Sequence, residues 1–289
     1  MPAGGKPTVR SRRLGAALKR YRLAAHLDQE HAAEALGCST AKVSRVEAGI
    51  SASRVGDVRI LLDLYGVGDA NVRAHLEHLA RMSNKRGWWL DYAGMVSDEH
   101  ADVIALETDA SYIRTWQPLF IPGLLQTPGY FKTLAGASVT VHPPETIEKA
   151  MAVRRERKRV IEEAGSHFAA VVWEPALTAP MPSREVHREQ LMYVLDAARR
   201  QNVTVQVLPY SEWSAAHMAS HFVLYSFGPE PAPEAVAFDS TTSTVLIEDL
   251  EDVAKHARIF EALRSAALSP KRSLAFLENV IAGIPKSEG

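Results

Sequence analysis

The stretch GCSTAKVSRVEAG, which runs from residue 37 to residue 49, decides how the first part of the chain folds. It has the pattern of a short helix framed by two glycines, with Ser39 at the N-cap and a glycine at the left-handed stop. Val43, Val46 and then Ile50 recur at helical spacing, which predicts that they face a core. Ser39 is expected to turn the same way. The other side chains are then expected to face outward: Thr40, Ala41, Lys42, Ser44, Arg45 and Ala48.

Another short helix is predicted immediately before this one. Asp28 lies where an N-cap belongs, a small apolar run follows it, and the helix ends at Gly37. Two short helices joined by a tight turn form a helix-turn-helix, whose second helix enters the major groove of DNA. Gln29, in the first turn of the earlier helix, is expected near a phosphate or a base edge. The free amides at that helix start favour phosphate as well.

The outward face of residues 39–48 has the chemistry for reading DNA. Small residues allow close approach to the groove floor, Arg45 can make a bidentate contact to guanine, and Lys42 can reach guanine or phosphate. A helical bundle that never touches DNA is the alternative. The residues predicted to bind DNA are Gln29, Ser39, Thr40, Lys42, Ser44 and Arg45.

Three more helical patterns complete the first domain, over about 11–25, 54–65 and 70–85. In the first of them, Arg20 and Arg22 are expected on the face away from the core. The predicted organisation has three parts: a basic, flexible arm over 1–12, an all-α helix-turn-helix domain of about five helices over 13–85, and an α+β domain over 88–289 that regulates or binds a ligand or partner.

Residues 11–66 resemble the helix-turn-helix domain of the Xre/Cro-repressor superfamily. The strings that carry the resemblance are residues 29–33, LGCSTAKVSRVEAG and VRILLDLYGV. The chain departs from that pattern at His26, where a turn glycine is usual, and at Ala32, where a larger aliphatic residue is usual. One such module covers only a few base pairs, so a homodimer on a palindromic operator of double-stranded DNA is expected.

Composition indicates which classes of protein the chain can belong to. The chain has 289 residues, of which 46% are hydrophobic and 23% charged, as in a globular protein. It lacks both an apolar run of the ~20 residues that cross a bilayer and the apolar core of a signal peptide, so a cytoplasmic location without membrane contact is expected. Cys38 is the single cysteine, and neither a disulfide nor a metal or other cofactor is predicted.

Charge is distributed unevenly along the chain. Residues 1–50 hold nine Lys and Arg against four Asp and Glu, whereas the net charge of the whole chain is −1. A basic first segment on an acidic remainder indicates a polyanionic partner for the first segment. Solvated helix faces would give the same count.

The sequence changes character beyond Gly87, where all five tryptophans lie. Helical and strand-like segments alternate there, with the last strand candidates close together, which predicts an α+β domain with hairpins. This part resembles the C-terminal domain found behind the same helix-turn-helix in WhiJ-like regulators of sporulating actinobacteria. The strings that carry the resemblance are IPGLLQTPGY, residues 154–158, REQLMYVLDAARRQNVTVQVLP and FEALRSAALSPKRS. The departures are Lys158 and the segment WEPAL. The resemblance implies control of development or secondary metabolism, usually beside a small protein encoded next door.

Three groups of side chains in this part are candidates for a ligand or partner site. Aromatic residues could line a cavity or simply fill a core; they are Trp88, Trp89, Trp116, Phe120 and Trp173. Four arginines could bind an acidic ligand or partner or belong to a charged helix face, and Arg154 and Arg157 are the candidates chosen from them; the four are Arg154, Arg155, Arg157 and Arg159. His217 and His221 have the spacing of two metal ligands, but no glutamate follows His217 as a base, so pocket lining or a structural role is favoured for His217.

No catalytic motif of a hydrolase, kinase or redox enzyme occurs in the sequence, so the protein is not expected to be an enzyme. The first hypothesis is a sequence-specific transcriptional regulator whose C-terminal domain dimerises and responds to a small-molecule effector or a small partner protein. The alternative is an antitoxin-like protein that sequesters a small neighbour-encoded protein and autoregulates. Stoichiometric co-purification of such a protein would favour the alternative.

Overall fold

The computed structural model describes residues 8–83, 87–92, 96–137, 143–179, 181, 183–228, 233–239 and 243–285. The chain forms two compact units, residues 1–90 and residues 91–289. Each unit has its own hydrophobic core and is described by itself below.

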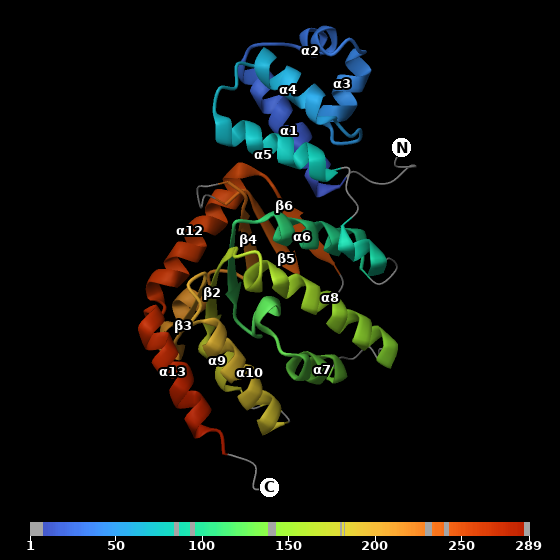
Figure 1. Ribbon diagram of the computed structural model, residues 1–289. Helices are drawn as coiled ribbons and strands as arrows, with labels where there is room; N and C mark the ends of the chain where they lie inside the picture. The colour runs from blue at the N-terminus through green and yellow to red at the C-terminus, as the bar shows by residue number, and fades with distance from the viewer. Residues whose placement is uncertain are drawn as a thin grey trace. The chain divides into compact units, whose positions relative to one another are not determined.

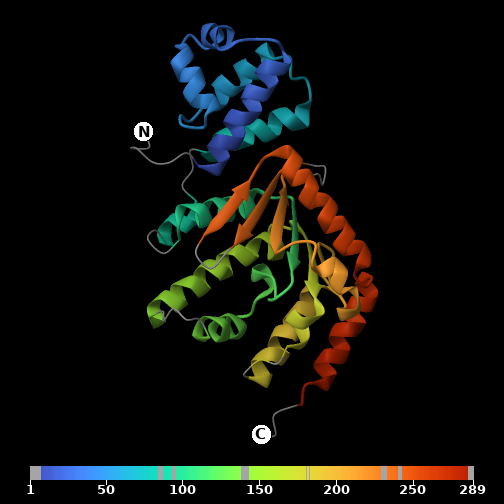
Figure 2. The ribbon, with the colours of Figure 1, turned by 180° about the vertical axis from the view of Figure 1, so that it is seen from behind.

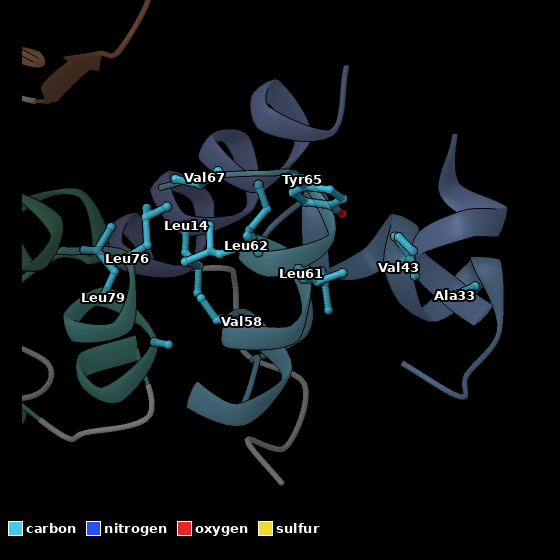
Figure 3. Packing of buried hydrophobic residues seen from close by; sticks show 14 residues of the cluster. Leu14, Ala33, Val43, Val58, Leu61, Leu62, Tyr65, Val67, Leu76 and Leu79 are labelled. Atoms are coloured by element: carbon cyan, nitrogen blue, oxygen red, sulfur yellow. The ribbon is translucent and has the colours of Figure 1, made fainter. Parts of the chain in front are cut away.

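Unit 1 is all-α (Figure 1). Its helices are α1 (Val9–Ala24), α2 (Gln29–Ala35), α3 (Thr40–Glu47), α4 (Val55–Leu64) and α5 (Ala70–Ser83), and the short 3-10 helix η1 (Trp88–Tyr92) begins at its end. Figure 3 shows the core, in which Val43 of α3 and Val58 of α4 lie among side chains from α1, α2 and α5. The predicted all-α domain of about five helices is therefore confirmed.

The turns of unit 1 require left-handed backbone at defined positions. Gly37 and Gly49 adopt φ values of 59° and 72°, as expected for residues that end α2 and α3. His26, between α1 and α2, adopts a φ of 58° and is the only non-glycine residue with positive φ among the described residues. Glycine adopts this left-handed conformation more readily than a residue with a side chain.

The first helix begins earlier than the sequence analysis placed it. Thr8 is the N-cap of α1 and its hydroxyl accepts a hydrogen bond from the Ser11 amide at 3.2 Å. Val9 and Arg10 are buried, and the Arg10 guanidinium lies 5.3 Å from the Trp89 ring centroid. Residues 9–12 of the predicted flexible arm are therefore helical, because an N-cap and apolar burial hold them in α1.

Helices α1 and α3 approach closely at Gly15. A Cβ atom added to Gly15 would clash with the carbonyl oxygen of Val46 and would lie 2.6 Å from that of Glu47. Backbone atoms cannot move aside as a flexible side chain can. The end of α3 therefore packs directly on the α1 backbone, and only glycine fits at this crossing.

Unit 2 is an α+β domain built on a six-stranded sheet. The strands are β1 (Tyr112–Gln117), β2 (His167–Trp173), β3 (Val203–Leu208), β4 (Phe222–Ser226), β5 (Ala235–Asp239) and β6 (Thr244–Ile247), in the spatial order β3-β2-β1-β4-β5-β6. The strands β1, β2 and β3 are parallel, whereas β4, β5 and β6 are antiparallel to their neighbours. The expected hairpins form the second half, and the parallel half was not predicted.

Helices connect the strands and cover the sheet. They are α6 (Asp98–Asp109), α7 (Pro128–Gly136), α8 (Pro144–Glu162), α9 (Glu174–Thr178), α10 (Arg184–Ala197), α11 (Trp213–Ala216), α12 (Leu250–Ala266) and α13 (Pro270–Gly283), with the 3-10 turns η2 (Gly123–Leu125) and η3 (Tyr210–Glu212). Figures 1 and 2 show α12 on one face of the sheet and α6 and α8 on the other.

Side chains alternate between the two faces of the sheet, as the strand period of two requires. In β1, Trp116 packs into the core on the α12 face, with Phe222 of β4 and Phe260 of α12. Its neighbours Thr115 and Gln117 point to the opposite face and line a cavity there. No helix in the described ranges is long and apolar enough to span a membrane.

Candidate nucleic-acid interface and C-terminal cavity

The face of α3 that the sequence predicts to read DNA is largely accessible to solvent. Thr40, Ser44 and Arg45 are exposed, and Lys42 is partly exposed. Arg45 forms neither a hydrogen bond nor an ion pair with another described residue of the unit, so its guanidinium is available to a partner. Ala41 and Ala48, on the same outward side, are exposed as well.

Two residues predicted to face the core do not do so. Ser39 is exposed, because it is the N-cap of α3 and its hydroxyl accepts a hydrogen bond from the Lys42 amide at 3.3 Å. Ile50 is 60% exposed, because Gly49 ends the helix and turns the chain away from the helical stripe. Ser39 therefore belongs to the accessible surface, which suits its place among the predicted DNA-binding residues.

A buried ion pair fixes the inner side of the same helix. The Arg22 guanidinium of α1 donates to both carboxylate oxygens of Glu47 at 2.6 and 3.0 Å, and to the Leu27 carbonyl at 2.8 Å. Burial opposes the ionisation of Glu47, but the hydrogen bonds from Arg22 and Gln29 outweigh it and lower the pKa of this carboxyl. The prediction that Arg22 lies on the outer face is wrong, since it is the buried partner of Glu47.

Gln29 joins this network. Its amide Nε2 donates to Glu47 at 2.9 Å, which holds the side chain at the junction of α2 and α3. The Asp28 carboxylate accepts from the amides of Glu30 and His31 at 2.9 and 3.1 Å. The prediction that free amides at the start of α2 favour phosphate is therefore wrong for these two amides, because an aspartate already caps them.

Neighbouring charges tune the interface. The Lys42 ammonium lies 3.7 Å from the Asp57 carboxylate of α4 in a partly exposed ion pair. Lys19 of α1 is exposed, and its charge lies close enough to Glu47 to favour the ionised carboxylate. Lys42 therefore lies near the start of α3, and Lys19 lies near its end.

Unit 2 contains a cavity of about 650 Å³ on the sheet face opposite α12. Its floor includes Ile113 and Thr115 of β1, and its walls come from α6, α8 and the segment 117–126. The wall side chains that carry charge or can titrate are His100, Glu107, Arg154, Arg157, His221 and Asp239. Cavities of this size are typical of small-molecule sites.

Arg157 and Glu107 form a buried pair in this wall. The Arg157 Nε and Nη2 donate to the two Glu107 oxygens, each at 2.7 Å, and the side chains are only 11% and 5% exposed. Burial alone would lower the pKa of Arg157, but the charge and hydrogen bonds of Glu107 raise it. Arg157 therefore stays charged, and the Glu107 carboxylate is its partner in the ion pair.

Arg154, one helical turn before Arg157, has no such partner. Its guanidinium carbon lies 3.7 Å from the Phe131 ring centroid, and its buried Nε lacks a hydrogen-bond acceptor. Burial, together with the repulsive charge of Arg157, lowers the pKa of Arg154 to about 10. Arg154 still carries a positive charge at neutral pH.

The structure separates the predicted aromatic candidates. Phe120 lines the cavity. Trp116 is fully buried on the α12 face, where its indole nitrogen donates to the Ala219 carbonyl at 3.0 Å, and Trp173 packs against the same core. Of the two alternatives, core packing therefore holds for these two tryptophans, because strand alternation turns them to the side of the sheet away from Phe120.

Trp88 and Trp89 were grouped with these aromatic residues, but unit 1 extends to residue 90 and includes them. Their rings meet edge to face, with centroids 5.9 Å apart. Contacts with α1 explain this placement, since Trp89 lies under Arg10.

His217 does not line the cavity. It is exposed, its Nδ1 lies 2.7 Å from the Trp213 carbonyl oxygen, and its ring packs edge to face on Trp213. His221, four residues later, does line the cavity because the chain leaves α11 and enters β4 there. The pairing of the two histidines by helical spacing fails for this reason.

Sequence reasoning missed most of the polar residues of the cavity, and three of them matter most for its chemistry. His100 and Glu107 lie on α6 and Gln126 follows η2, and nothing in their spacing relates them to Arg154. The buried Glu107 had one signal, because a carboxylate inside the apolar helix pattern VIALE requires a buried cation.

Comparisons with known proteins agree with this division. Residues 13–76 match a family described as a helix-turn-helix domain, and residues 100–279 match the domain of unknown function DUF5753. No curated protein and no solved structure matches the chain. The helix-turn-helix match supports a DNA-binding regulator.

Proposed function

Because the chain belongs to the DUF5753 family and carries a helix-turn-helix domain before it, we propose that it is a sequence-specific, DNA-binding transcriptional regulator. The observation that carries the proposal is the accessible, unpaired Arg45 on the outward face of α3. Development or secondary metabolism is the process proposed for its control, from the WhiJ-like resemblance.

The recognition surface consists of the exposed face of α3 together with Gln29. Thr40, Ser44 and Arg45 face the base edges, and small side chains let the helix approach them. The Lys42 ammonium leaves Asp57 and contacts guanine or phosphate when DNA binds, because its 3.7 Å ion pair with Asp57 is partly solvated and weak. Glu47 and Arg22 hold the helix at the angle that this contact needs.

Arg45→Ala is expected to weaken binding to the preferred operator by about tenfold to a hundredfold, because a bidentate arginine–guanine contact contributes about 1–3 kcal/mol. Selection of genomic fragments by the purified protein, followed by sequencing, would give a palindromic motif whose guanine preference disappears in the variant. Arg81→Ala is the matched control, because Arg81 is an exposed arginine of α5, 3.0 Å from Glu77.

The control should leave the selected motif unchanged. If neither wild-type protein nor variants enrich any sequence, the assignment of α3 as the recognition helix fails. If Arg45→Ala enriches the same motif with the same guanine preference, Arg45 does not read a base.

Lys19→Ala is expected to flatten the salt dependence of DNA affinity by about one unit of slope without changing the preferred sequence, because a phosphate contact releases counterions but reads no base. The measurement is operator affinity by fluorescence anisotropy across a series of salt concentrations. An unchanged slope would remove Lys19 from the phosphate contacts.

Unit 2 acts in this proposal as the dimerisation and effector domain. Two copies of the helix-turn-helix on a palindrome require a homodimer, and an effector changes operator affinity only if it favours one arrangement of the two copies. The cavity on the α6 and α8 side of the sheet is the place for a small effector. An effector that binds without changing operator affinity would contradict the coupling.

A further inference from the structure

One arginine in the wall of the cavity in unit 2 has no carboxylate of a described residue in contact with it. Arg157 is neutralised by Glu107 through two hydrogen bonds. Arg154 stacks on Phe131, and no hydrogen bond or ion pair joins it to any residue within the described ranges. The Nε of Arg154 is buried, and a buried donor without an acceptor is costly unless a ligand supplies one.

Two of the remaining titratable groups of the wall affect the charge that a ligand can carry. Burial and the charge of Arg157 lower the pKa of His100, which is therefore uncharged at neutral pH. Asp239 is exposed at the end of β5 and accepts a hydrogen bond from the Thr244 hydroxyl at 2.6 Å, so it acts on Arg154 only through space. The Asp239 carboxylate would repel a doubly charged anion such as a phosphate monoester more strongly than a singly charged one.

Apolar side chains supply much of the remaining wall. Ile113, Phe168 and Val223 come from three neighbouring strands on the same sheet face. Leu119 and Phe120, in the segment that borders the cavity, are 66% and 49% exposed, although large apolar side chains gain free energy when covered. An apolar ligand body of small-molecule size would cover these surfaces.

Gln126 adds a specific polar feature. Its amide Nε2 donates to the Ile121 carbonyl at 2.8 Å, which fixes the orientation of the amide. Gln126 lines the cavity, and its Oε1 is buried and accepts no hydrogen bond from the described part of the chain. A hydroxyl or N–H group of a ligand would satisfy this oxygen.

We propose that this cavity binds a monoanionic carboxylic acid with an apolar body and a hydrogen-bond donor. The carboxylate binds Arg154, and the donor binds the amide oxygen of Gln126. The inference rests on the proposed function only where it calls this ligand the effector of a regulator. Binding itself requires neither DNA nor a second subunit.

Ligand-observed saturation-transfer NMR on the full-length protein tests the proposal. The acids are hexanoate, decanoate, phenylacetate, naphthylacetate and hydroxydecanoate. Binding of each acid is compared with binding of its uncharged primary amide. We expect the acids to bind in preference to their amides. Arg154→Met should weaken the best acid by about tenfold to a hundredfold, because a hydrogen bond to a charged group contributes about 1.5–3 kcal/mol.

Arg155→Met is the matched control, because Arg155 is the exposed neighbour on the same helix and lies outside the cavity wall. It should bind the acids as the wild type does. The proposal is overturned if no acid binds better than its amide, or if Arg154→Met and Arg155→Met bind the acids equally.

A separate titration of operator DNA keeps the two proposals distinguishable. Failure of acid binding, with operator selection intact, removes the ligand class and leaves the regulator. Acid binding that depends on Arg154, without any effect on operator affinity, supports the site and removes the effector coupling.

Discussion

Arg22→Met is expected to destabilise the helix-turn-helix unit by about 3–5 kcal/mol, because removing one partner of a buried ion pair leaves an uncompensated charge. The carboxylate left without its cation is that of Glu47, whose side chain is 4% exposed. A typical domain has only about 5–15 kcal/mol of stability, so the change is a large fraction of the total. Peptide-resolved hydrogen exchange in α1 and α3 would measure it within the full-length chain.

Two further variants test whether the loss of stability in Arg22→Met comes from the unpaired Glu47. Arg20→Met removes an exposed arginine from the same helix and should change stability by less than about 0.5 kcal/mol. The double variant Arg22→Met, Glu47→Leu should recover most of the loss, because no charge is left unpaired. Equal losses for Arg22→Met and Arg20→Met would show that the pair with Glu47 contributes nothing.

Arg157→Met is expected to destabilise unit 2 by about 3–5 kcal/mol for the same reason, because Glu107 would lose both of its hydrogen bonds inside the sheet–helix interface. Arg154→Met, one helical turn away, is expected to cost less than about 1 kcal/mol or to stabilise the domain, since it removes a buried charge that has no partner. Hydrogen exchange in α6 and β1 reports both changes.

The contrast between these two arginines separates structural from functional roles. A residue kept for ligand binding can lower the stability of the protein. Its removal then makes the protein more stable, as is seen when unsatisfied active-site residues are replaced. If Arg154→Met destabilises unit 2 as strongly as Arg157→Met, the guanidinium serves packing against Phe131 rather than ligand binding.

Much of the fold of unit 1 could be predicted, because its signals are local. N-caps at Asp28 and Ser39, the glycine stops and the helical apolar period all lie within a few residues of the structure they specify. Arg22 was misplaced because the helical pattern places a charged residue outward unless a buried partner is known. That partner, Glu47, lies 25 positions later in the chain.

The sheet of unit 2 was harder to predict for a related reason. Each strand could be recognised from its own residues, but the pairing of β1 with β2 and β4 joins segments that are distant in sequence. The face on which Trp116 and Trp173 lie follows from that pairing. Phe120, Arg154 and Arg157 were candidates from the sequence and line one cavity in the structure. That cavity also depends on α6 and Gln126, whose relation to them only the fold establishes.

The central position of β1 has a consequence for synthesis of the chain on the ribosome. The helices of unit 1 can form as soon as their residues emerge, but β1 must wait for β4: the Ser111 hydroxyl, for example, meets the Gly228 carbonyl 117 positions later. At about 5–20 residues per second, that interval lasts roughly 6–23 s. During this time β1 has an unpaired edge that can bind other nascent strands. A nascent chain would thus carry a completed DNA-binding unit for several seconds before the domain that is proposed to control it exists.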